Sequence, residues 1–272
     1  MFCVVAIFKN ESEILEEWIT HYLKEGCSHF FLIDNGSTDD YKSILDNFEN
    51  ITLVVDNTKH AQANLYNKYF LNKIQQYDWT VICDLDEFIY ARDKYNTIDS
   101  YLNSLDKTIT QIAIPWKIFG SNGFNTLEQK EPKSVIVSFT KRINYDKKAG
   151  FQGVNEIKGQ FKMNLCKCIA RSSAITNIGI HHSKMKYGHT IQSNHSVESN
   201  VPFIPMNETV LKSSQLQLNH YAIRSLDWYT RIKMTRGSAA SQNSANIKSQ
   251  LSYFTEFDAV SNDIKDDELL EK

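Results

Sequence analysis

The first 90 residues alternate between apolar, strand-like runs and amphipathic, helix-like stretches, and this alternation constrains the fold most strongly. The run Phe2–Phe8 is continuously apolar, as expected for a strand buried on both faces of a parallel sheet. Three further strands are predicted at residues 29–33, 51–55 and 79–83. Strands that alternate with helices in this way are typical of a doubly wound α/β fold.

The helices of this first part carry recognisable end signals. Asn10 is predicted to cap a helix whose apolar residues recur at helical spacing, and Gly26 is predicted to end it. The remaining expected elements are helices at 62–76 and 225–237 and strands at 112–115, 135–139 and 165–170. Cys166 and Cys168 are expected on one face of the last strand, as small core residues. The acidic residues after Glu256 predict a peripheral helix or a frayed tail.

Composition narrows the class of protein. The 272 residues are 42% hydrophobic with a formal net charge of −2, so no basic excess indicates nucleic-acid binding. The five cysteines have no CxxC spacing, which argues against a zinc site or a disulfide framework. The sequence shows no signal peptide and no apolar stretch of the roughly 20 residues that cross a bilayer. We therefore expect a cytoplasmic protein, with peripheral membrane contact left open.

Polar clusters follow three of the predicted parallel strands. They are Lys9-Asn-Glu11, the loop Asp34-Asn-Gly-Ser-Thr-Asp39, and Asp84-Leu-Asp86. Ligands of open α/β sheets bind at the carboxyl ends of the strands, where such loops converge. Three clusters on one edge of the sheet therefore predict a binding site there.

The Asp84–Asp86 pair points to a metal ion. In an extended chain these two side chains project to the same side, and two adjacent carboxylates repel each other unless a cation lies close by. Oxygen ligands of this kind suit Mg²⁺ or Mn²⁺, which could hold a diphosphate. The alternative is a solvated turn. Similarly, Asp34 could accept hydrogen bonds from a nucleotide base or ribose, or could form an Asx-turn that leads into a helix.

These segments together resemble a known family. Val-Ala-Ile-Phe-Lys-Asn-Glu11, Leu-Ile-Asp-Asn-Gly-Ser-Thr-Asp39 and Cys-Asp-Leu-Asp-Glu-Phe88 are similar to family 2-like glycosyltransferases of the GT-A type, in the branch of glycosyltransferase family 92. Trp-Lys-Ile-Phe-Gly-Ser-Asn-Gly123, Asn-His-Tyr-Ala-Ile-Arg-Ser225, Lys233 and Arg236-Gly237 also resemble that branch. The resemblance spans about residues 2–237.

The resemblance implies a GT-A type, Rossmann-like fold: a mostly parallel sheet flanked by helices, with a less regular acceptor-side half. It implies a single domain over residues 1–255, with a nucleotide-sugar-binding half at 1–110, an acceptor-binding half at 111–255 and an acidic tail at 256–272. The implied activity is sugar transfer from a UDP-sugar to an acceptor hydroxyl, with Mn²⁺ or Mg²⁺ and with inversion. A glycan or glycolipid acceptor and a role in surface glycan synthesis are expected.

Site residues follow from the same resemblance. Asp84 and Asp86 are implied as the metal motif, and Asp84 also contacts the nucleotide. The nucleotide pocket is expected to be lined by Ala6, Asn10, Glu11 and Asp34. A histidine completes the metal shell in many GT-A enzymes. The candidates here are the neighbouring residues His181 and His182, of which His182 is taken as the ligand, and His220.

The acceptor side is expected after the last parallel strand of the first half. Trp116 offers a flat face for a sugar ring, and Gly120 and Ser121 follow it in a glycine-containing loop. Trp116 could instead be a core residue. Glu156, in a glycine-flanked segment, is favoured as the catalytic base over Asp146 and over the charged, surface-like run that contains Glu128 and Glu131.

Other functions remain open at this stage. A DxD phosphatase would need Thr or Val two residues after its second aspartate, where this chain has Phe88. A sugar nucleotidyltransferase would need a glycine-rich loop after the first strand, but Lys9-Asn-Glu-Ser12 lacks glycine. An inactive sugar- or nucleotide-binding domain is the alternative from a different class.

Overall fold

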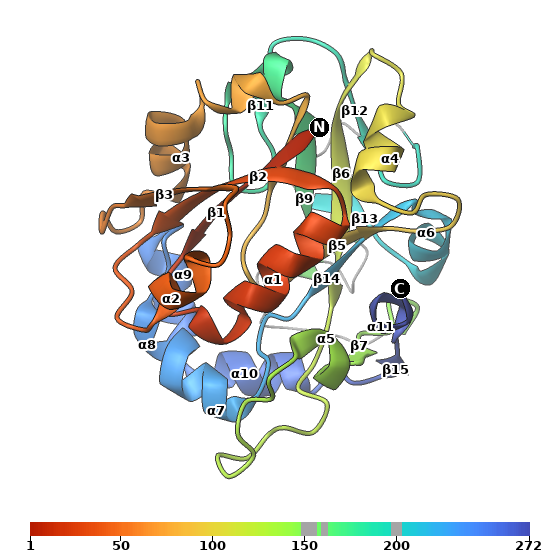
Figure 1. Cartoon of the computed structure of the whole chain (residues 1–272). Coiled ribbons are helices and arrows are strands. Elements are labelled where there is room, and N and C mark those ends of the chain that lie inside the picture. The colour runs from red at the N-terminus through yellow and green to blue at the C-terminus, as the bar shows by residue number, and fades with distance from the viewer. Residues whose placement is uncertain (148–156, 159–162, 197–202) are drawn as a thin grey trace.

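The computed structural model describes residues 1–147, 157–158, 163–196 and 203–272. Helices pack around a central, strongly twisted sheet (Figure 1). The main path of that sheet runs β3-β2-β1-β4-β9-β6-β14-β5. Its strands are β1 (Phe2–Phe8), β2 (Cys27–Asp34), β3 (Ile51–Val55), β4 (Trp79–Ile82), β5 (Glu87–Ala91), β6 (Ile109–Ile118), β9 (Met163–Arg171) and β14 (Leu216–His220). The expected α/β class is confirmed.

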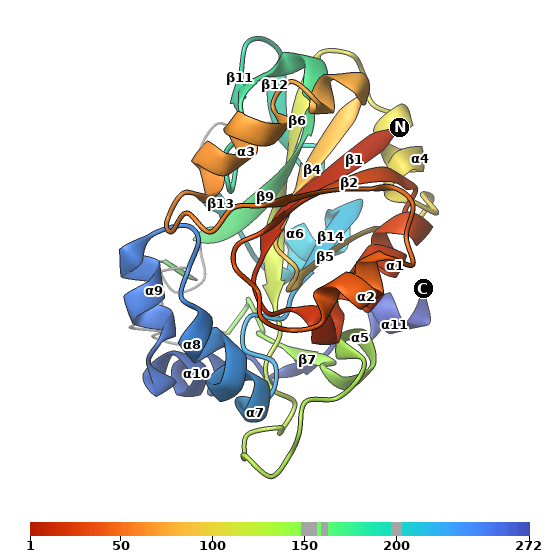
Figure 2. The same cartoon turned by 60° about the vertical axis from the view of Figure 1, so that its left-hand side comes forward.

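The N-terminal half of the sheet is parallel, as the sequence predicts. β1 lies between β2 and β4, with Val4 opposite Phe30 on one side and Val81 on the other. Successive residues of β1 face opposite sides of the sheet. Val4 packs in the same core cluster as Trp18 of α1 (Ser12–Lys24), whereas Val5 packs with Tyr66 of α3 (Gln62–Phe70). The two helices therefore cover opposite faces (Figure 2).

Of the two predicted ends of α1, the C-terminal one is confirmed and the N-terminal one is wrong. Gly26, with φ +94°, follows the end of α1 as predicted. The predicted cap at Asn10 is wrong, because α1 begins at Ser12 and Asn10 has a left-handed backbone, φ 55°. The Asn10 side-chain oxygen accepts instead from the Thr38 N–H at 2.7 Å. Asn10 thus joins the loops that follow β1 and β2.

The second half of the sheet is mixed. β9 lies antiparallel between β4 and β6, with Ile169 opposite both Val81 and Ile112. β14 is parallel to β6 and antiparallel to β5. Cys166 and Cys168 of β9 are buried, as expected. This insertion of β9 joins the parallel half to the strands that carry the second half of the site.

One predicted strand is wrong. Residues 135–139 were expected to be extended because they are rich in Val and Ile, but the chain forms a helical turn there, α5 (Val135–Ser138). The Ser134 hydroxyl accepts from the Val137 N–H, and the Glu17 carboxylate accepts from the Val135 N–H at 2.8 Å. These hydrogen bonds satisfy the first N–H groups of the turn and outweigh its β propensity.

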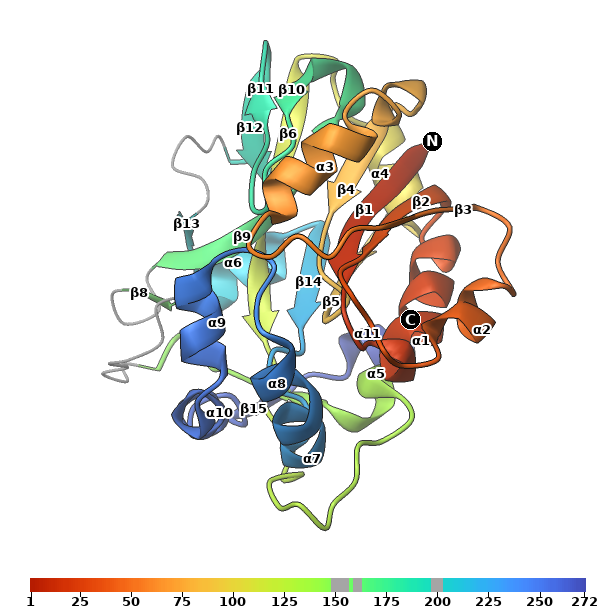
Figure 3. The ribbon, with the colours of Figure 1, turned by 90° about the vertical axis from the view of Figure 1, so that its left-hand side faces the viewer.

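The predicted helix at 225–237 is confirmed with a local change of pitch. It consists of α7 (Leu226–Trp228), a π-helical turn (Tyr229–Lys233) and α8 (Met234–Arg236). α9 (Gln242–Lys248) and α10 (Leu251–Asp258) follow. α8 and α9 lie beside the lower end of the sheet in Figure 3, which is the carboxyl end of β1.

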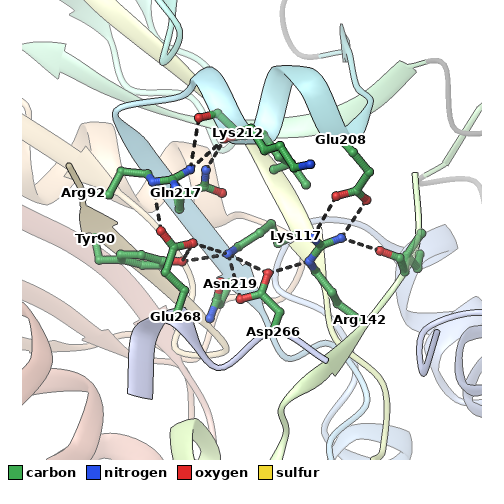
Figure 4. Close-up of polar contacts among 12 residues, drawn as sticks. Tyr90, Arg92, Lys117, Arg142, Glu208, Lys212, Gln217, Asn219, Asp266 and Glu268 are labelled. Carbon is green, nitrogen blue, oxygen red and sulfur yellow. Dashed lines mark hydrogen bonds and ion pairs between the residues drawn. The ribbon is translucent and has the colours of Figure 1, made fainter. Parts of the chain in front are cut away.

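The acidic C-terminal segment is packed rather than frayed. β15 (Ile264–Lys265) pairs with β7 (Lys141–Arg142), and Leu269 of α11 (Glu268–Glu271) is buried. Asp266 and Glu268 contact Lys117 of β6, and Asp266 also contacts Arg142 (Figure 4). The segment is ordered because its carboxylates neutralise cations that β6 and β7 bury.

Smaller elements complete the described chain. They are α2 (Tyr41–Leu45), a 3₁₀ turn (Ile74–Gln76), α4 (Ile98–Asn103), β8 (Ile157–Lys158), a second 3₁₀ turn (Ser172–Ala174), β10 (Ile175–Asn177), β11 (Lys184–Met185), β12 (His189–Gln192), β13 (Phe203–Pro205) and α6 (Glu208–Ser213). Among the residues described, no helix combines the length and the hydrophobicity needed to cross a bilayer.

Candidate active site

A cavity of about 170 Å³ opens at the carboxyl end of the parallel strands. Residues from both halves of the chain line it, from the end of β1 to α9. Its polar and aromatic lining includes Lys9, Glu11, Gln62, Asp84, Asp86, Trp116, His181, His220, Lys233, Arg236 and Lys248. The structure thus gathers the Asp84–Asp86 motif and part of the predicted set around one space.

The turn that carries Asp84 and Asp86 connects β4 to β5 and is anchored by α1. The Trp18 indole N–H donates to the backbone carbonyls of Asp84 and Glu87, at 3.2 and 3.1 Å. The Asp84 N–H donates to the Glu87 carboxylate at 2.8 Å. The buried apolar strand β4 and the aromatic face of α1 therefore fix the backbone of the motif.

Each motif carboxylate has a buried lysine as its partner. Lys167 Nζ of β9 lies 2.9 Å from Asp84 Oδ2, and Lys233 Nζ lies 3.0 Å from Asp86 Oδ2. Gln62 also donates to Asp84 Oδ1, at 3.0 Å. Burial alone would raise the pKa of both carboxyl groups, but the adjacent ammonium groups outweigh it, and both pKa values are lowered. The pair is therefore ionised at neutral pH.

Lys167 was missed by the sequence analysis. It is fully buried and also lies 3.3 Å from the carboxylate of Glu87, whose pKa burial raises to about 8. The available signal was its position between Cys166 and Cys168, as the one cation in the otherwise apolar run Leu165–Ala170. Buried charges are normally paired, so such a lysine indicates a carboxylate partner elsewhere in the chain.

Of the competing histidines, His220 lies nearest the motif. Its Nε2 is 3.7 Å from Asp86 Oδ1, and its buried Nδ1 has no hydrogen-bond partner among the described residues. Burial lowers the pKa of His220 to about 3, so its imidazole is neutral. His181 lines the cavity and bonds through Nδ1 to the Cys166 carbonyl oxygen at 3.0 Å, whereas His182 is exposed and does not line the cavity.

The side chains in this site have ligand atoms that suit a divalent metal ion, but they are not spaced as a complete coordination site. Asp86, Asp84 and a neutral His220 supply the oxygen and nitrogen atoms that Mn²⁺ accepts. In the part of the chain that the structure describes, no three His, Cys, Asp or Glu side chains are already grouped around one point. Lys167 and Lys233 engage the carboxylates instead, so an ion would compete with them.

The predicted nucleotide-pocket residues divide into two groups. Glu11 lines the cavity, and its buried carboxylate contacts Arg224 and Arg236. Ala6 is fully buried in the core, and neither it nor Asn10 lines the cavity. Asp34 is also absent from the lining, because its carboxylate accepts from the Ser37 N–H at 2.7 Å and the Tyr41 hydroxyl at 2.9 Å.

The predicted acceptor residues are also separated. Trp116 belongs to β6 rather than to a loop, and its ring lines the cavity with its centroid 4.2 Å from that of His220. Gly120 and Ser121 lie against the C-terminal segment instead. The Ser121 N–H donates to Asp258, and a side chain at Gly120 would meet the Ser261 carbonyl oxygen at 2.5 Å.

The base predicted at Glu156 lies outside the described residues. Of the alternatives, Asp146 accepts from the Glu208 N–H at 3.2 Å. Glu131 was expected in a surface-like run, but its side chain is only 4% exposed and bonds to Arg224 Nε at 2.6 Å. The charged residues around Glu131 therefore gave a wrong prediction of its exposure.

The twisted α/β sheet with an acidic pair at its carboxyl edge defines a protein of the GT-A type. The model of glycosyltransferase family 92 matches residues 1–262, so the chain belongs to this family. Over 147 residues it is 24% identical to a family 92 protein from Ricinus communis. This aligned stretch makes up 52% of this chain and 26% of that protein. A family 92 protein from Oryza sativa subsp. japonica is 23% identical over 146 residues, which make up 52% of this chain and 24% of that protein. The chain thus matches about a quarter of each relative's length.

Two solved structures have a weak similarity to parts of the chain. Glucosyl-3-phosphoglycerate synthase from Mycobacterium tuberculosis, in complex with Mn²⁺ and UDP-glucose, has 16% identity and a TM-score of 0.28, covering 43% of this chain and 44% of that one. A 4-diphosphocytidyl-2C-methyl-D-erythritol synthase from Anaerococcus prevotii has 11% identity and a TM-score of 0.35, covering 78% and 96%.

Proposed function

We propose that this protein transfers a sugar from a UDP-sugar to the hydroxyl group of an acceptor, with inversion at the anomeric carbon. The observation that carries the proposal is the Asp84–Asp86 pair, which faces a cavity beside His220 at the carboxyl edge of the sheet. Membership of glycosyltransferase family 92 supports the reaction class. The acceptor we propose is a glycan or glycolipid, in surface glycan synthesis on the cytoplasmic side, with peripheral membrane contact left open.

Asp84, Asp86 and His220 are the residues that would hold Mn²⁺ or Mg²⁺. A bound divalent ion supplies positive charge for the diphosphate leaving group. The protein's own part is to keep the two carboxyl groups ionised and the imidazole neutral. Trp18 contributes by fixing the turn backbone, and Trp116 provides an apolar wall beside His220 against which a sugar ring can pack.

The acceptor hydroxyl must lose a proton as its oxygen attacks the anomeric carbon opposite the departing UDP. Glu156 remains our proposed base. Glu156→Gln should bind UDP-sugar like the unmodified protein but transfer sugar at least about 100-fold more slowly. Unchanged transfer would move the role to another carboxylate.

The test of the proposed function is metal-dependent turnover of UDP-Gal, UDP-Glc, UDP-GlcNAc and UDP-GalNAc, measured as UDP release. Asp86→Asn removes one ligand charge with little change in shape and should reduce turnover by at least about 100-fold. Asp46→Asn, at an exposed position after α2, is the matched control and should be unaffected.

Two results would contradict the proposal. Full turnover in EDTA would show that no divalent ion is needed. Binding of UDP-sugars without turnover of any donor, with all plausible acceptors supplied, would favour a binding domain over a transferase.

A further inference from the structure

Two cations on the helical segment that follows β14 face the cavity beside the acidic motif. We propose that Arg236, together with Lys233, binds the diphosphate group of the donor nucleotide, an inference that rests on the proposed function. Neither residue has a role in the prediction from sequence. The ligand class is a nucleoside diphosphate, recognised here through its diphosphate rather than its base.

Arg236 has hydrogen-bonding capacity left for a ligand. Its Nη1 donates to the Glu11 carboxylate and to the Lys9 carbonyl oxygen, the latter at 3.4 Å. Its Nε and Nη2 make no hydrogen bond within the described part of the chain, and its side chain is 16% exposed and lines the cavity. A guanidinium has five N–H donors in a planar fork that matches a phosphate group. The free side of this fork is therefore suited to an anion in the cavity.

Lys233 places a second positive charge in the same cavity, in contact with the metal motif. Its ammonium group donates to Asp86 Oδ2 and to the Ala222 carbonyl oxygen, and it lines the same cavity. An ammonium group has three N–H donors, so one remains for a ligand. A group bound by both residues would thus lie next to Asp86, where the leaving diphosphate of the proposed reaction belongs.

The arginine is held in place by a buried chain of charges. Glu11 bridges Arg236 and Arg224, whose guanidinium lies 3.3 Å from Glu11 and 2.6 Å from Glu131. The Trp228 ring lies beside all three cations, with its centroid 4.2 Å from Arg224, 5.5 Å from Arg236 and 5.7 Å from Lys233. These contacts are all made by protein groups, and they restrict the conformations of the Arg236 side chain.

Arg224 shows how firmly this arrangement is imposed. It is 1% exposed, and its backbone has a left-handed conformation, φ 52°, which is unfavourable for a residue with a long side chain. Surrounding structure must hold a residue in such a conformation, and strain of this kind concentrates at functional sites. The strained residue here positions Glu11, and Glu11 in turn positions Arg236.

The test uses inorganic pyrophosphate with Mg²⁺ as the probe, measured by calorimetry on the full chain. Arg236→Gln should weaken pyrophosphate binding at least about tenfold, the equivalent of about 1.4 kcal/mol. Affinity for uridine, which lacks phosphate, should not change. Arg231→Gln is the matched control, because Arg231 lies on the same segment but pairs with Glu13 and Asp227 away from the cavity.

A second variant separates positioning from direct binding. Glu11→Gln should also weaken pyrophosphate, and its effect should be non-additive with Arg236→Gln, because both changes act through one guanidinium. Additive effects would contradict the positioning role. Unfolding midpoints of all variants are measured alongside, so that a loss of binding is read only from folded protein.

The outcomes distinguish this inference from the proposed function. Pyrophosphate binding that Arg236→Gln leaves intact, or that Arg231→Gln weakens equally, would overturn the diphosphate site, as would an unmodified protein that does not bind pyrophosphate. Pyrophosphate binding sensitive to Arg236, together with no turnover of any UDP-sugar, would support the site and overturn the transferase.

Discussion

At the scale of single residues, chemistry in this site depends on pairing between charges that lie far apart in the sequence. That the Asp84–Asp86 pair lines a cavity at the sheet edge could be predicted, because it directly follows an apolar strand and ligands of open α/β sheets bind at that end. Their partners Lys167 and Lys233 could not be assigned, because nothing local in the sequence says which buried carboxylate a lysine will meet. His220 could be named only as one of several candidates for the same reason.

Asp34 is a polar residue at a strand end whose hydrogen-bond partners in the structure belong to the fold. Both of its oxygens accept hydrogen bonds from the loop and from α2, and its carboxylate is buried. We predict that Asp34→Ala lowers the free energy of unfolding by about 1–3 kcal/mol, because the Ser37 N–H and the Tyr41 hydroxyl lose their acceptor. Urea denaturation measures this cost.

The same variant should bind UDP with nearly unchanged affinity by calorimetry. A strong loss of UDP binding with an unchanged free energy of unfolding would instead restore the nucleotide-binding role predicted from the sequence.

At the scale of secondary-structure elements, the long periodic and continuously apolar segments were predictable, and the short ones were not. β1 and α1 have enough residues for their burial pattern to decide their type. Residues 135–139 do not, and there the side chains of Ser134 and Glu17, which satisfy the first N–H groups, decide the outcome. Glu17 lies on a different helix, so no window of local sequence contains the deciding contact.

The packing of α1 against β5 contains a buried histidine that makes stability depend on pH. His21 Nε2 lies 2.7 Å from the Ile89 carbonyl oxygen, and burial lowers the pKa of His21 from 6.5 to about 4. The unfolded chain therefore takes up a proton below pH 6.5 that the folded protein refuses until about pH 4. The free energy of unfolding therefore has its full value with respect to His21 above pH 6.5, and it decreases as the pH falls towards 4.

We predict that this one group accounts for a loss of about 3 kcal/mol in unfolding free energy across that window. His21→Gln can keep the hydrogen bond to Ile89 but does not titrate. Urea denaturation at pH 7.5 and pH 4.5 should show a smaller decline for the variant than for the unmodified protein. Equal declines would show that His21 does not carry the effect.

At the scale of the whole molecule, a buried charge cluster joins segments from five regions of the chain. Lys117 Nζ lies 2.7 Å from the Tyr90 hydroxyl and 3.1 Å from Asp266, and Arg142 bridges Asp266 to Glu208 (Figure 4). The C-terminal segment is thereby fastened to β5, β6 and β7. Composition could predict the acidity of this segment but not that its partners would be buried cations.

Removing one member of this cluster should be costly. Lys117→Met removes the buried cation that Asp266 and Glu268 share, and leaves Asp266 with Arg142 and Glu268 with Arg92. The cluster then has one excess negative charge, and we predict a loss of about 3–5 kcal/mol in the free energy of unfolding. Adding Asp266→Asn should recover part of that loss, because it removes one negative charge from a cluster that has lost a cation. Lys147→Met, which breaks an exposed pair with Asp263, should cost less than about 1 kcal/mol. If both lysine variants cost the same in urea denaturation, burial of the cluster does not matter.

The place of β9 between β4 and β6 has a consequence for the order in which the molecule can assemble. β1 to β4 complete their mutual pairing with residues 1–82 alone. Among the residues described, the strand that pairs with the other edge of β4 is β9, at residues 163–171. A nascent chain therefore carries an apolar sheet with an open edge while the intervening residues are synthesised, and open edges invite pairing with other chains. Sequence-distant pairing of this kind also slows folding. β9, which joins the two halves of the candidate active site, is thus also the strand without which the first half of the sheet cannot be completed during synthesis.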